Sequence, residues 1–194
     1  VLNVSLDAAN KETYQKIRMY DFDTVLNNLS NFVDEKNLMK AVVGKDRQQD
    51  LNIRDSYTHF LNEDWINKEI FFLVQEANKA IWNFNISFAE HVQFTKYQLN
   101  QYYGWHSDDN HAYKNKDRKL SVIISLNDSK NYTGGDVLLK DMSAISENEV
   151  FKCDQLKNTG TVIVFPSLIL HKVMPITSGT RYSLVNWIVG DQFK

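Results

Sequence analysis

The pattern of apolar and polar positions divides the chain into a helical first part and a strand-rich second part. Apolar residues between Phe22 and Val33 recur at i, i+3 and i+4, which predicts an amphipathic helix. The same spacing predicts a longer helix from Trp65 to Trp82, with Asn62 or Asp64 as its cap. Between the two, Lys40–Arg54 is charged and irregular, and we predict a surface loop there.

After Trp82 the apolar period changes from 3.6 to 2, which indicates strands. Ser87–Leu99 alternates between apolar and polar residues and is predicted to be the first strand. Six further strands are predicted at Tyr103–Asp108, Lys119–Leu126, Asp136–Leu139, Thr161–Phe165, His171–Pro175 and Tyr182–Val189. Turn residues such as Gly134-Gly135 and Thr177-Ser178-Gly179 separate the strands. Short strands after a helical preface predict an antiparallel β-sandwich or small barrel backed by helices.

Length and composition place the chain among ordinary globular domains. With 194 residues, 43% of them hydrophobic, it can form one domain with a sizeable core. We predict a single domain over 1–194, with a mainly helical support region at 1–86 and the strand-rich core at 87–192.

The net charge and the lack of long apolar runs limit the classes of partner that we expect. The formal net charge of −2 shows no basic excess, so we expect no nucleic-acid partner. No run of 18 or more apolar residues exists and the first residues lack a signal-peptide pattern, so we expect no membrane partner and a cytoplasmic location. The single cysteine, Cys153, excludes an internal disulfide and is expected to be an inert thiol. The sequence leaves the oligomeric state open.

Candidate chemistry centres on the segment Tyr103-Gly-Trp-His-Ser-Asp108. Residues two apart on a strand point to the same face, so His106 and Asp108 would present an imidazole and a carboxylate side by side. If His171 returns to the same place, two histidines and one carboxylate occupy one face of a metal ion. That set is typical of non-haem Fe(II) oxygenases, in which three coordination positions stay open.

Arg181 supplies a candidate anchor for an organic anion. With a turn between them, His171 and Arg181 are predicted to lie on neighbouring antiparallel strands, with Arg181 displaced by about 13 Å toward the turn. A dicarboxylate and an arginine side chain can span that gap, and the planar guanidinium suits a carboxylate. Ser183 should point the same way as Arg181. Taken singly, each residue has a simpler interpretation: a surface pair, a core histidine or a solvated arginine.

Four segments together resemble the prolyl 4-hydroxylase-like group of the Fe(II)- and 2-oxoglutarate-dependent dioxygenase superfamily, including its bacterial and viral members. The segment from Tyr97 to Asp108 resembles the group's Tyr-x-x-Gly-x-x-Tyr-x-x-His-x-Asp pattern. The other three are Leu126-Asn-Asp with Gly134-Gly-Asp136, Phe165-Pro-Ser with Leu170-His-Lys-Val-Met-Pro175, and Gly179-Thr-Arg-Tyr-Ser183. The chain departs from the pattern at Asn100, where the group often has glycine, and at Asp136, where it has glutamate.

The resemblance implies a double-stranded β-helix, or jelly-roll, core backed by N-terminal helices. It implies Fe(II) held by His106, Asp108 and His171, with 2-oxoglutarate and O₂ as co-substrates and ascorbate as reductant. Arg181 would hold the distal carboxylate of 2-oxoglutarate with help from Tyr97 and Ser183. Tyr103 would line the same pocket, and Trp187 is better explained by core packing.

The implied reaction is hydroxylation of an unactivated C–H bond. Because halogenating members replace the metal-binding carboxylate by a small residue, Asp108 favours hydroxylation. A peptidyl prolyl residue is the leading substrate by resemblance. A free amino acid, nucleobase or other small metabolite is the second candidate, and a non-catalytic β-sandwich that only binds metal or ligand is the third.

Overall fold

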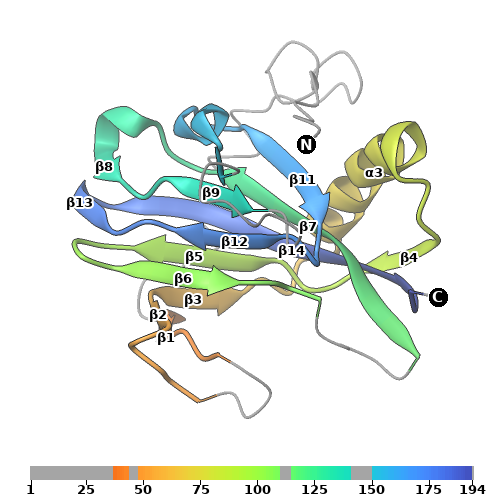
Figure 1. Cartoon of the computed structure of the whole chain (residues 1–194), viewed down its shortest axis with the longest axis horizontal. Coiled ribbons are helices and arrows are strands. Elements are labelled where there is room, and N and C mark those ends of the chain that lie inside the picture. The colour runs from red at the N-terminus through yellow and green to blue at the C-terminus, as the bar shows by residue number, and fades with distance from the viewer. Residues whose placement is uncertain (1–36, 44–47, 110–114, 141–149, 194) are drawn as a thin grey trace.

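A computed structural model describes residues 37–43, 48–109, 115–140 and 150–193 (Figure 1). The helix predicted at Phe22–Val33 lies outside these ranges. Among the helices in the described ranges, none combines the length and the apolar character needed to cross a membrane.

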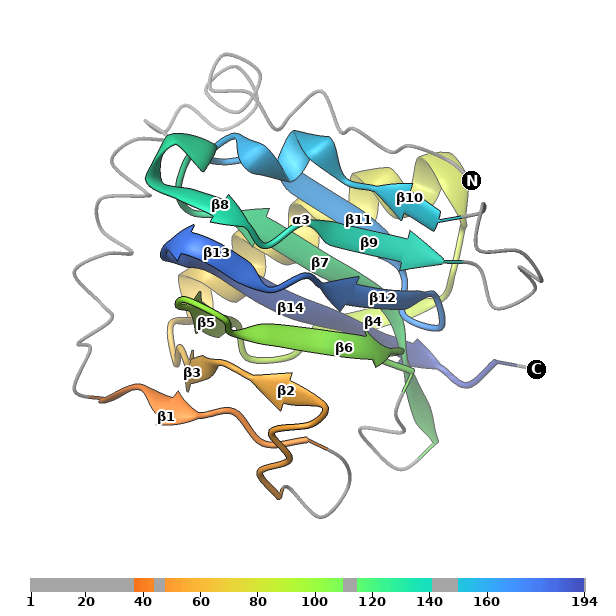
Figure 2. The same cartoon turned by 60° about the vertical axis from the view of Figure 1, so that its left-hand side comes forward.

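The described strands form two facing antiparallel sheets and a small strand pair (Figure 2). The major sheet has the order β1-β3-β5-β14-β7-β11, and β4 pairs with β14. Its strands are β1 (Met39–Lys40), β3 (Tyr57–Phe60), β4 (Ile86–Ala89), β5 (Gln93–Tyr97), β7 (Lys116–Ser125), β11 (Val162–Pro166) and β14 (Arg181–Asp191).

The minor sheet has the order β10-β9-β12-β6-β2. Its strands are β2 (Arg54–Asp55), β6 (Tyr102–His106), β9 (Val137–Lys140), β10 (Val150–Lys152) and β12 (Leu170–Val173). The separate pair consists of β8 (Tyr132–Gly134) and β13 (Ile176–Gly179), and short 3₁₀ helices occur at Ser129–Asn131 and Asp154–Lys157. This arrangement is the jelly-roll core that the sequence predicts.

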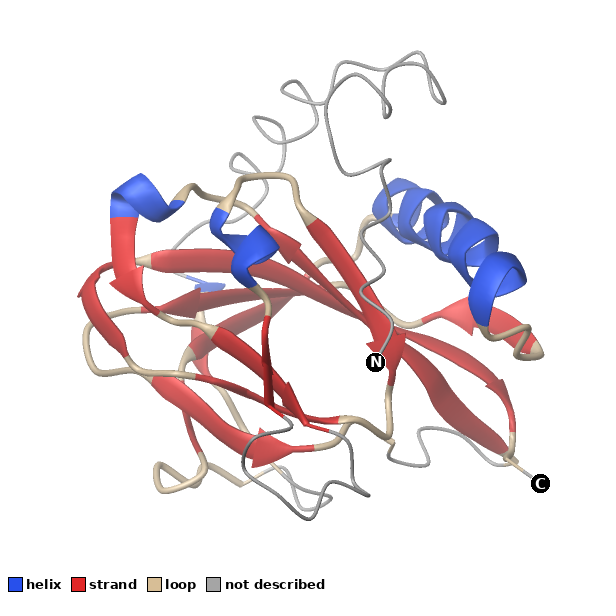
Figure 3. Ribbon diagram, turned by 45° about the horizontal axis from the view of Figure 1, so that its top comes forward, coloured by secondary structure: helices blue, strands red, loops and turns tan. Residues whose placement is uncertain are grey.

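One long helix, α3 (Asp64–Ile81), covers the major sheet on the side away from the minor sheet (Figure 3). Its apolar stripe includes Ile66, Ile70 and Val74, which are buried in one core cluster with Leu120 and Leu184 of the sheet. Burial of each such side chain contributes about 2 kcal/mol. The helix agrees to within a residue at each end with the one predicted at Trp65–Trp82.

A second core cluster, between the sheets, contains Ile123 and Phe165 from the major sheet and Val173 from the minor sheet. The apolar alternation of β7 explains how one sheet serves both clusters. Leu120, Val122 and Ile124 face the helix cluster, while Ile123 belongs to the cluster between the sheets.

The predicted strands are found with shifted bounds, and four local predictions are wrong. The N-cap of α3 is Glu63 rather than Asn62 or Asp64. Ser87–Leu99 contains two strands, β4 and β5, rather than one. The region Lys40–Arg54, predicted as a loop, contains the end of β1 and the start of β2. The segment 177–179, predicted as a turn, is part of β13 and pairs with β8, and only Gly179 has the positive φ of a turn residue.

The pairing of β13 with β8 changes where the candidate metal ligand His171 and the candidate anion anchor Arg181 lie. Because β13 intervenes, β12 and β14 are not neighbouring strands: His171 is in the minor sheet and Arg181 is in the major sheet. The two residues therefore lie on opposite sheets of the sandwich instead of along one sheet. The division at residue 86 stays a prediction, although β1, β2 and β3 add strands to the first region beside α3.

Candidate metal centre

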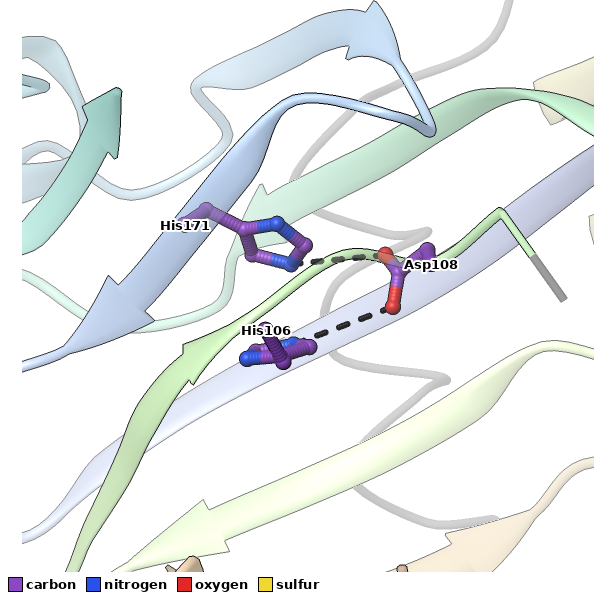
Figure 4. A group of neighbouring side chains, drawn as sticks. All are labelled: His106, Asp108 and His171. Carbon is purple, nitrogen blue, oxygen red and sulfur yellow. Dashed lines mark ion pairs between the residues drawn. The ribbon is translucent and has the colours of Figure 1, made fainter. Parts of the chain in front are cut away.

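The three predicted metal ligands converge on one point (Figure 4). His106 ends β6 and His171 lies on β12, and the antiparallel register places these two residues directly opposite each other. Asp108 follows β6 rather than lying on it, and its backbone N–H donates to the Ser167 carbonyl at 2.8 Å. The ligand atoms of all three residues lie within 4.8 Å of one another, and no other such group occurs in the ranges that the structure describes.

Backbone carbonyls orient both imidazole rings. Nδ1 of His106 lies 2.8 Å from the Gly104 oxygen, and Nδ1 of His171 lies 3.0 Å from the Ile169 oxygen. Because a carbonyl can only accept, Nδ1 carries the proton in each ring and the Nε2 lone pair is left for a ligand. Both Nε2 atoms face Asp108, at 3.7 Å from Oδ1 for His106 and 3.3 Å from Oδ2 for His171.

Two buried serines hold the carboxylate of Asp108. Ser121 on β7 donates from Oγ to Asp108 Oδ2 at 2.8 Å, and its Oγ lies 3.0 Å from Oγ of Ser167. Both serines are fully enclosed. This network fixes the orientation of the carboxylate and connects the major sheet to the candidate metal ligands.

The charge states of the three residues are strongly coupled. Burial, with the neighbouring His171, lowers the pKa of His106 to about 3. Burial opposes ionisation of Asp108, but the two histidines outweigh it and hold the pKa of Asp108 well below its usual range. Burial likewise opposes the charged form of His171, yet Asp108 outweighs it and raises the pKa of His171. Because a metal binds the neutral imidazole, a bound cation would compete with protonation of His171 at Nε2.

This donor set fits Fe(II). Two neutral imidazoles and one carboxylate on one side of an ion are the facial triad of non-haem iron sites. Each ligand has a second partner that fixes its direction, as metal ligands usually do.

Arg181 lies at the start of β14, on the inner side of the major sheet, and is only 1% exposed. Its Nη1 donates to Ser183 Oγ at 3.1 Å, as the common orientation of the two residues predicts. Tyr97 is its cross-strand partner on β5, with the guanidinium carbon 5.9 Å from the ring centre. Nη2 is buried without a hydrogen-bond partner among the described residues. An orphaned, buried guanidinium nitrogen is the group that a carboxylate would satisfy.

Gly135 makes room for Arg181. It has a φ of +61°, and a Cβ built there would lie 3.1 Å from Arg181 Cδ and 2.5 Å from Ile176 Cδ1. Gly134-Gly135 therefore serves the backbone turn that we predict and also admits the arginine. Asn100, where the resembled group often has glycine, has a φ of +64°. Asparagine is one of the few other residues that tolerate this conformation.

Tyr103 lies against the candidate ligands. Its ring stacks on that of His106 with centroids 3.5 Å apart, and burial raises the pKa of its phenol to about 12. The phenol is therefore neutral at physiological pH and able to donate. Trp187 is buried, and its ring packs against the guanidinium of Arg118 at 4.0 Å. Its side chain also contributes to the lowered pKa of Asp108, so a role in packing alone stays a prediction.

The sequence analysis did not single out three residues near the centre: Ser121, Ser167 and Arg54. Ser121 alternates with Ile123 along β7, and this alternation could have placed its hydroxyl on the inner face. Arg54, Ser56 and Thr58 alternate as buried positions from β2 to β3, but all three are polar, so the hydrophobic pattern gives no signal for them. Cys153 is partly buried, and burial raises the pKa of its thiol to about 11, consistent with the inert thiol we predict.

Comparison with known sequences identifies the family. The pattern of the 2OG-Fe(II) oxygenase superfamily matches residues 92–189. A PKHD-type hydroxylase of Prochlorococcus marinus strain AS9601 is 31% identical over 184 residues, which covers 92% of this chain and 77% of the relative. The chain spans about half the length of some other curated relatives, such as 56% of a PKHD-type hydroxylase from strain MIT 9211.

Solved structures agree on the fold. A Pseudomonas putida prolyl-4-hydroxylase superimposes with a TM-score of 0.64 at 18% identity, covering 88% of each chain. A prolyl hydroxylase from Trichoplax adhaerens, solved with a hypoxia inducible factor peptide fragment, gives a TM-score of 0.65 at 19% identity, covering 87% of this chain and 76% of that one. The family pattern, the relatives and the converging His-Asp-His group lead to one conclusion: this chain belongs to the 2OG-Fe(II) oxygenase superfamily.

Proposed function

We propose that this chain is an Fe(II)- and 2-oxoglutarate-dependent hydroxylase. Two observations carry the proposal: a buried His106-Asp108-His171 group on the side of the minor sheet, and Arg181 on the major sheet, whose buried Nη2 has no partner among the described residues. The His-Asp-His group would bind the metal, and Arg181 would bind a carboxylate of the co-substrate. A binding protein without catalysis would have little need of both.

The protein's part in the reaction is to hold and orient. His106 and His171 would bind iron through Nε2, and Asp108 would bind through a carboxylate oxygen that Ser121 steadies. Arg181 would take the distal carboxylate of 2-oxoglutarate, with Ser183 and Tyr97 beside it.

When bound, iron, 2-oxoglutarate and O₂ supply the oxidising chemistry: one oxygen atom enters succinate and the other becomes the product hydroxyl, with release of CO₂. The apolar cluster between the sheets excludes water from the space around these groups.

A peptidyl prolyl residue is the substrate we propose first. Support comes from the prolyl hydroxylase structures of similar fold, one of which holds a peptide fragment. A free amino acid or other small metabolite is the alternative.

The test is succinate formation by the purified chain with Fe(II), 2-oxoglutarate and ascorbate, first without substrate and then with prolyl peptides or free amino acids. Slow uncoupled turnover that one substrate class accelerates would support the proposal. A protein that binds Mn(II) but forms no succinate under any condition would instead be the non-catalytic binder.

A further inference from the structure

Arg54 is a second buried arginine near the candidate centre. It lies on β2 opposite Tyr103 of β6 and is 7% exposed. Its Nε donates to Ser56 Oγ at 2.8 Å and its Nη2 to Gln93 Oε1 at 3.1 Å. Its guanidinium carbon lies 4.5 Å from the centre of the Tyr103 ring. All of these partners are neutral, so the positive charge of Arg54 is buried without a counter-charge.

In the same protein, the guanidinium of Arg118 is paired with a carboxylate and serves as a comparison. It makes a two-pronged pair with Glu90, with both N–O distances at 2.7 Å. No carboxylate pairs with Arg54 among the described residues, and its Nη1 has no hydrogen-bond partner there. Nη1 is not among the fully enclosed polar atoms that lack a partner, so it can be reached from outside. A buried charge without a partner is costly, which makes Arg54 a candidate for binding an anion.

The position of Arg54 connects that anion to the reaction. Tyr103 contacts Arg54 and also stacks on His106, with a ring centroid distance of 3.5 Å. An anion on Arg54 would therefore lie one aromatic ring away from the candidate metal ligands. That separation suits the acidic group of a molecule whose C–H bond is presented to the metal.

The charges of the loaded site leave Arg54 uncompensated. On the proposed function, the two positive charges of Fe(II) balance the two negative charges of 2-oxoglutarate. Asp108 balances Arg181, and both histidines bind as neutral ligands. One positive charge, that of Arg54, remains beside the site, and an internal residue of a peptide would bring nothing to balance it.

We propose that Arg54 binds a carboxylate of the primary substrate. The substrate class is then a molecule with a free acid close to the hydroxylated carbon, either a free amino acid or the C-terminal residue of a peptide. This inference rests on the proposed function and narrows it: among prolyl peptides it keeps only those that end in the hydroxylated residue, and it keeps the free amino acid. The planar guanidinium can hold the acid through two hydrogen bonds, while Tyr103 fixes the orientation of the guanidinium.

The experiment compares acids with their amides. The full chain is loaded with Mn(II) and 2-oxoglutarate, and binding is measured by calorimetry for the standard L-amino acids and for short peptides ending in proline. Each compound is tested as the free acid and as the C-terminal amide. The best acid should bind about 10- to 100-fold more tightly than its amide, as expected for hydrogen bonds to a charged group. The amino-acid and peptide arms distinguish the two sources of carboxylate.

Variants assign the preference to Arg54. Arg54→Gln should abolish the difference between acid and amide, and Arg54→Lys should keep part of it. Both should still bind Mn(II) and 2-oxoglutarate and form succinate slowly. Lys172→Gln is the matched control, because this substitution also removes one positive charge from the minor sheet. Lys172 packs on Trp105, with its Nζ 4.7 Å from the ring centre. The control variant should leave the acid preference intact.

The inference is wrong if no acid binds the wild-type protein more tightly than its amide, or if Arg54→Gln retains the preference. Such a result with normal 2-oxoglutarate turnover would refute the role of Arg54 alone. Failure to bind metal or 2-oxoglutarate would instead refute the proposed function.

Discussion

The two sheets that face each other across the candidate centre carry different polar groups. The minor sheet presents His106 and His171 from directly paired strands, with Asp108 just beyond. The major sheet presents a cation and hydroxyls, above all Arg181 and Ser183. On the proposed function, metal binding would depend on the minor-sheet side and co-substrate binding on the major sheet, so that mutation should separate the two functions.

The largest effect should follow from removing a ligand on the minor-sheet side. His106→Ala or Asp108→Ala takes away one of three donors, so Mn(II) affinity should fall by more than about 100-fold and succinate formation should stop. Calorimetry with Mn(II) and a succinate assay measure the two effects. Normal turnover in either variant would contradict the assignment of the metal centre.

On the major sheet, Arg181→Ala should spare the metal. The loss of charge-assisted hydrogen bonds should weaken 2-oxoglutarate by a few kcal/mol, seen as a raised KM, while Mn(II) affinity stays at the wild-type value. A parallel loss of metal in this variant would break the division between the sheets. Thermal unfolding checks that the buried cavity left by the substitution has not destabilised the fold.

Ser121 is the exception that sharpens the comparison, because it lies on the major sheet but bonds to Asp108. Ser121→Ala should lower Mn(II) affinity by about tenfold by freeing the carboxylate, with little change in affinity for 2-oxoglutarate. Ser125→Ala is the control, since Ser125 is buried on the same strand and donates to the Asn127 carbonyl instead. If both variants lowered Mn(II) affinity equally, the cause would be destabilisation of β7 in general and not loss of the Ser121–Asp108 hydrogen bond.

The last prediction concerns pH and the stability of the metal-free protein. Burial, with His171, lowers the pKa of His106 from 6.5 to about 3, so the unfolded chain takes up a proton there before the folded chain does. The contribution of neutral His106 to the free energy of unfolding is present above pH 6.5 and is lost as the pH falls toward 3. Urea unfolding in EDTA should show the stability of wild type relative to His106→Gln falling by about 1 to 2 kcal/mol between pH 6.5 and pH 5. A pH-independent difference would show that His106 titrates normally.

Local pattern predicted the strands, because these depend on short-range spacing, and the three residues proposed as metal ligands lie together in the fold. His106 and Asp108 are two residues apart, and the alternation around His171 marks a strand. Sheet membership depends on pairings between distant segments, which periodicity does not encode. For this reason His171 and Arg181 were expected on neighbouring strands, whereas they lie on opposite sheets.

Arg54 was missed for a different reason. Its strand, β2, has two residues and both are polar, so nothing in its hydrophobicity distinguishes it from a loop. Its burial follows from pairing with β6, where Tyr103 covers it. Ser121 was missed because a small hydroxyl residue within an apolar strand resembles ordinary packing until its partner is known.

The direct opposition of His106 and His171 has a mechanical consequence. An ion shared by both imidazoles would form a removable cross-link between two strands that are far apart along the chain, and closing such a loop restricts the unfolded ensemble. A bound metal would thus stabilise the folded chain, and amide exchange along β6 and β12 would slow on loading.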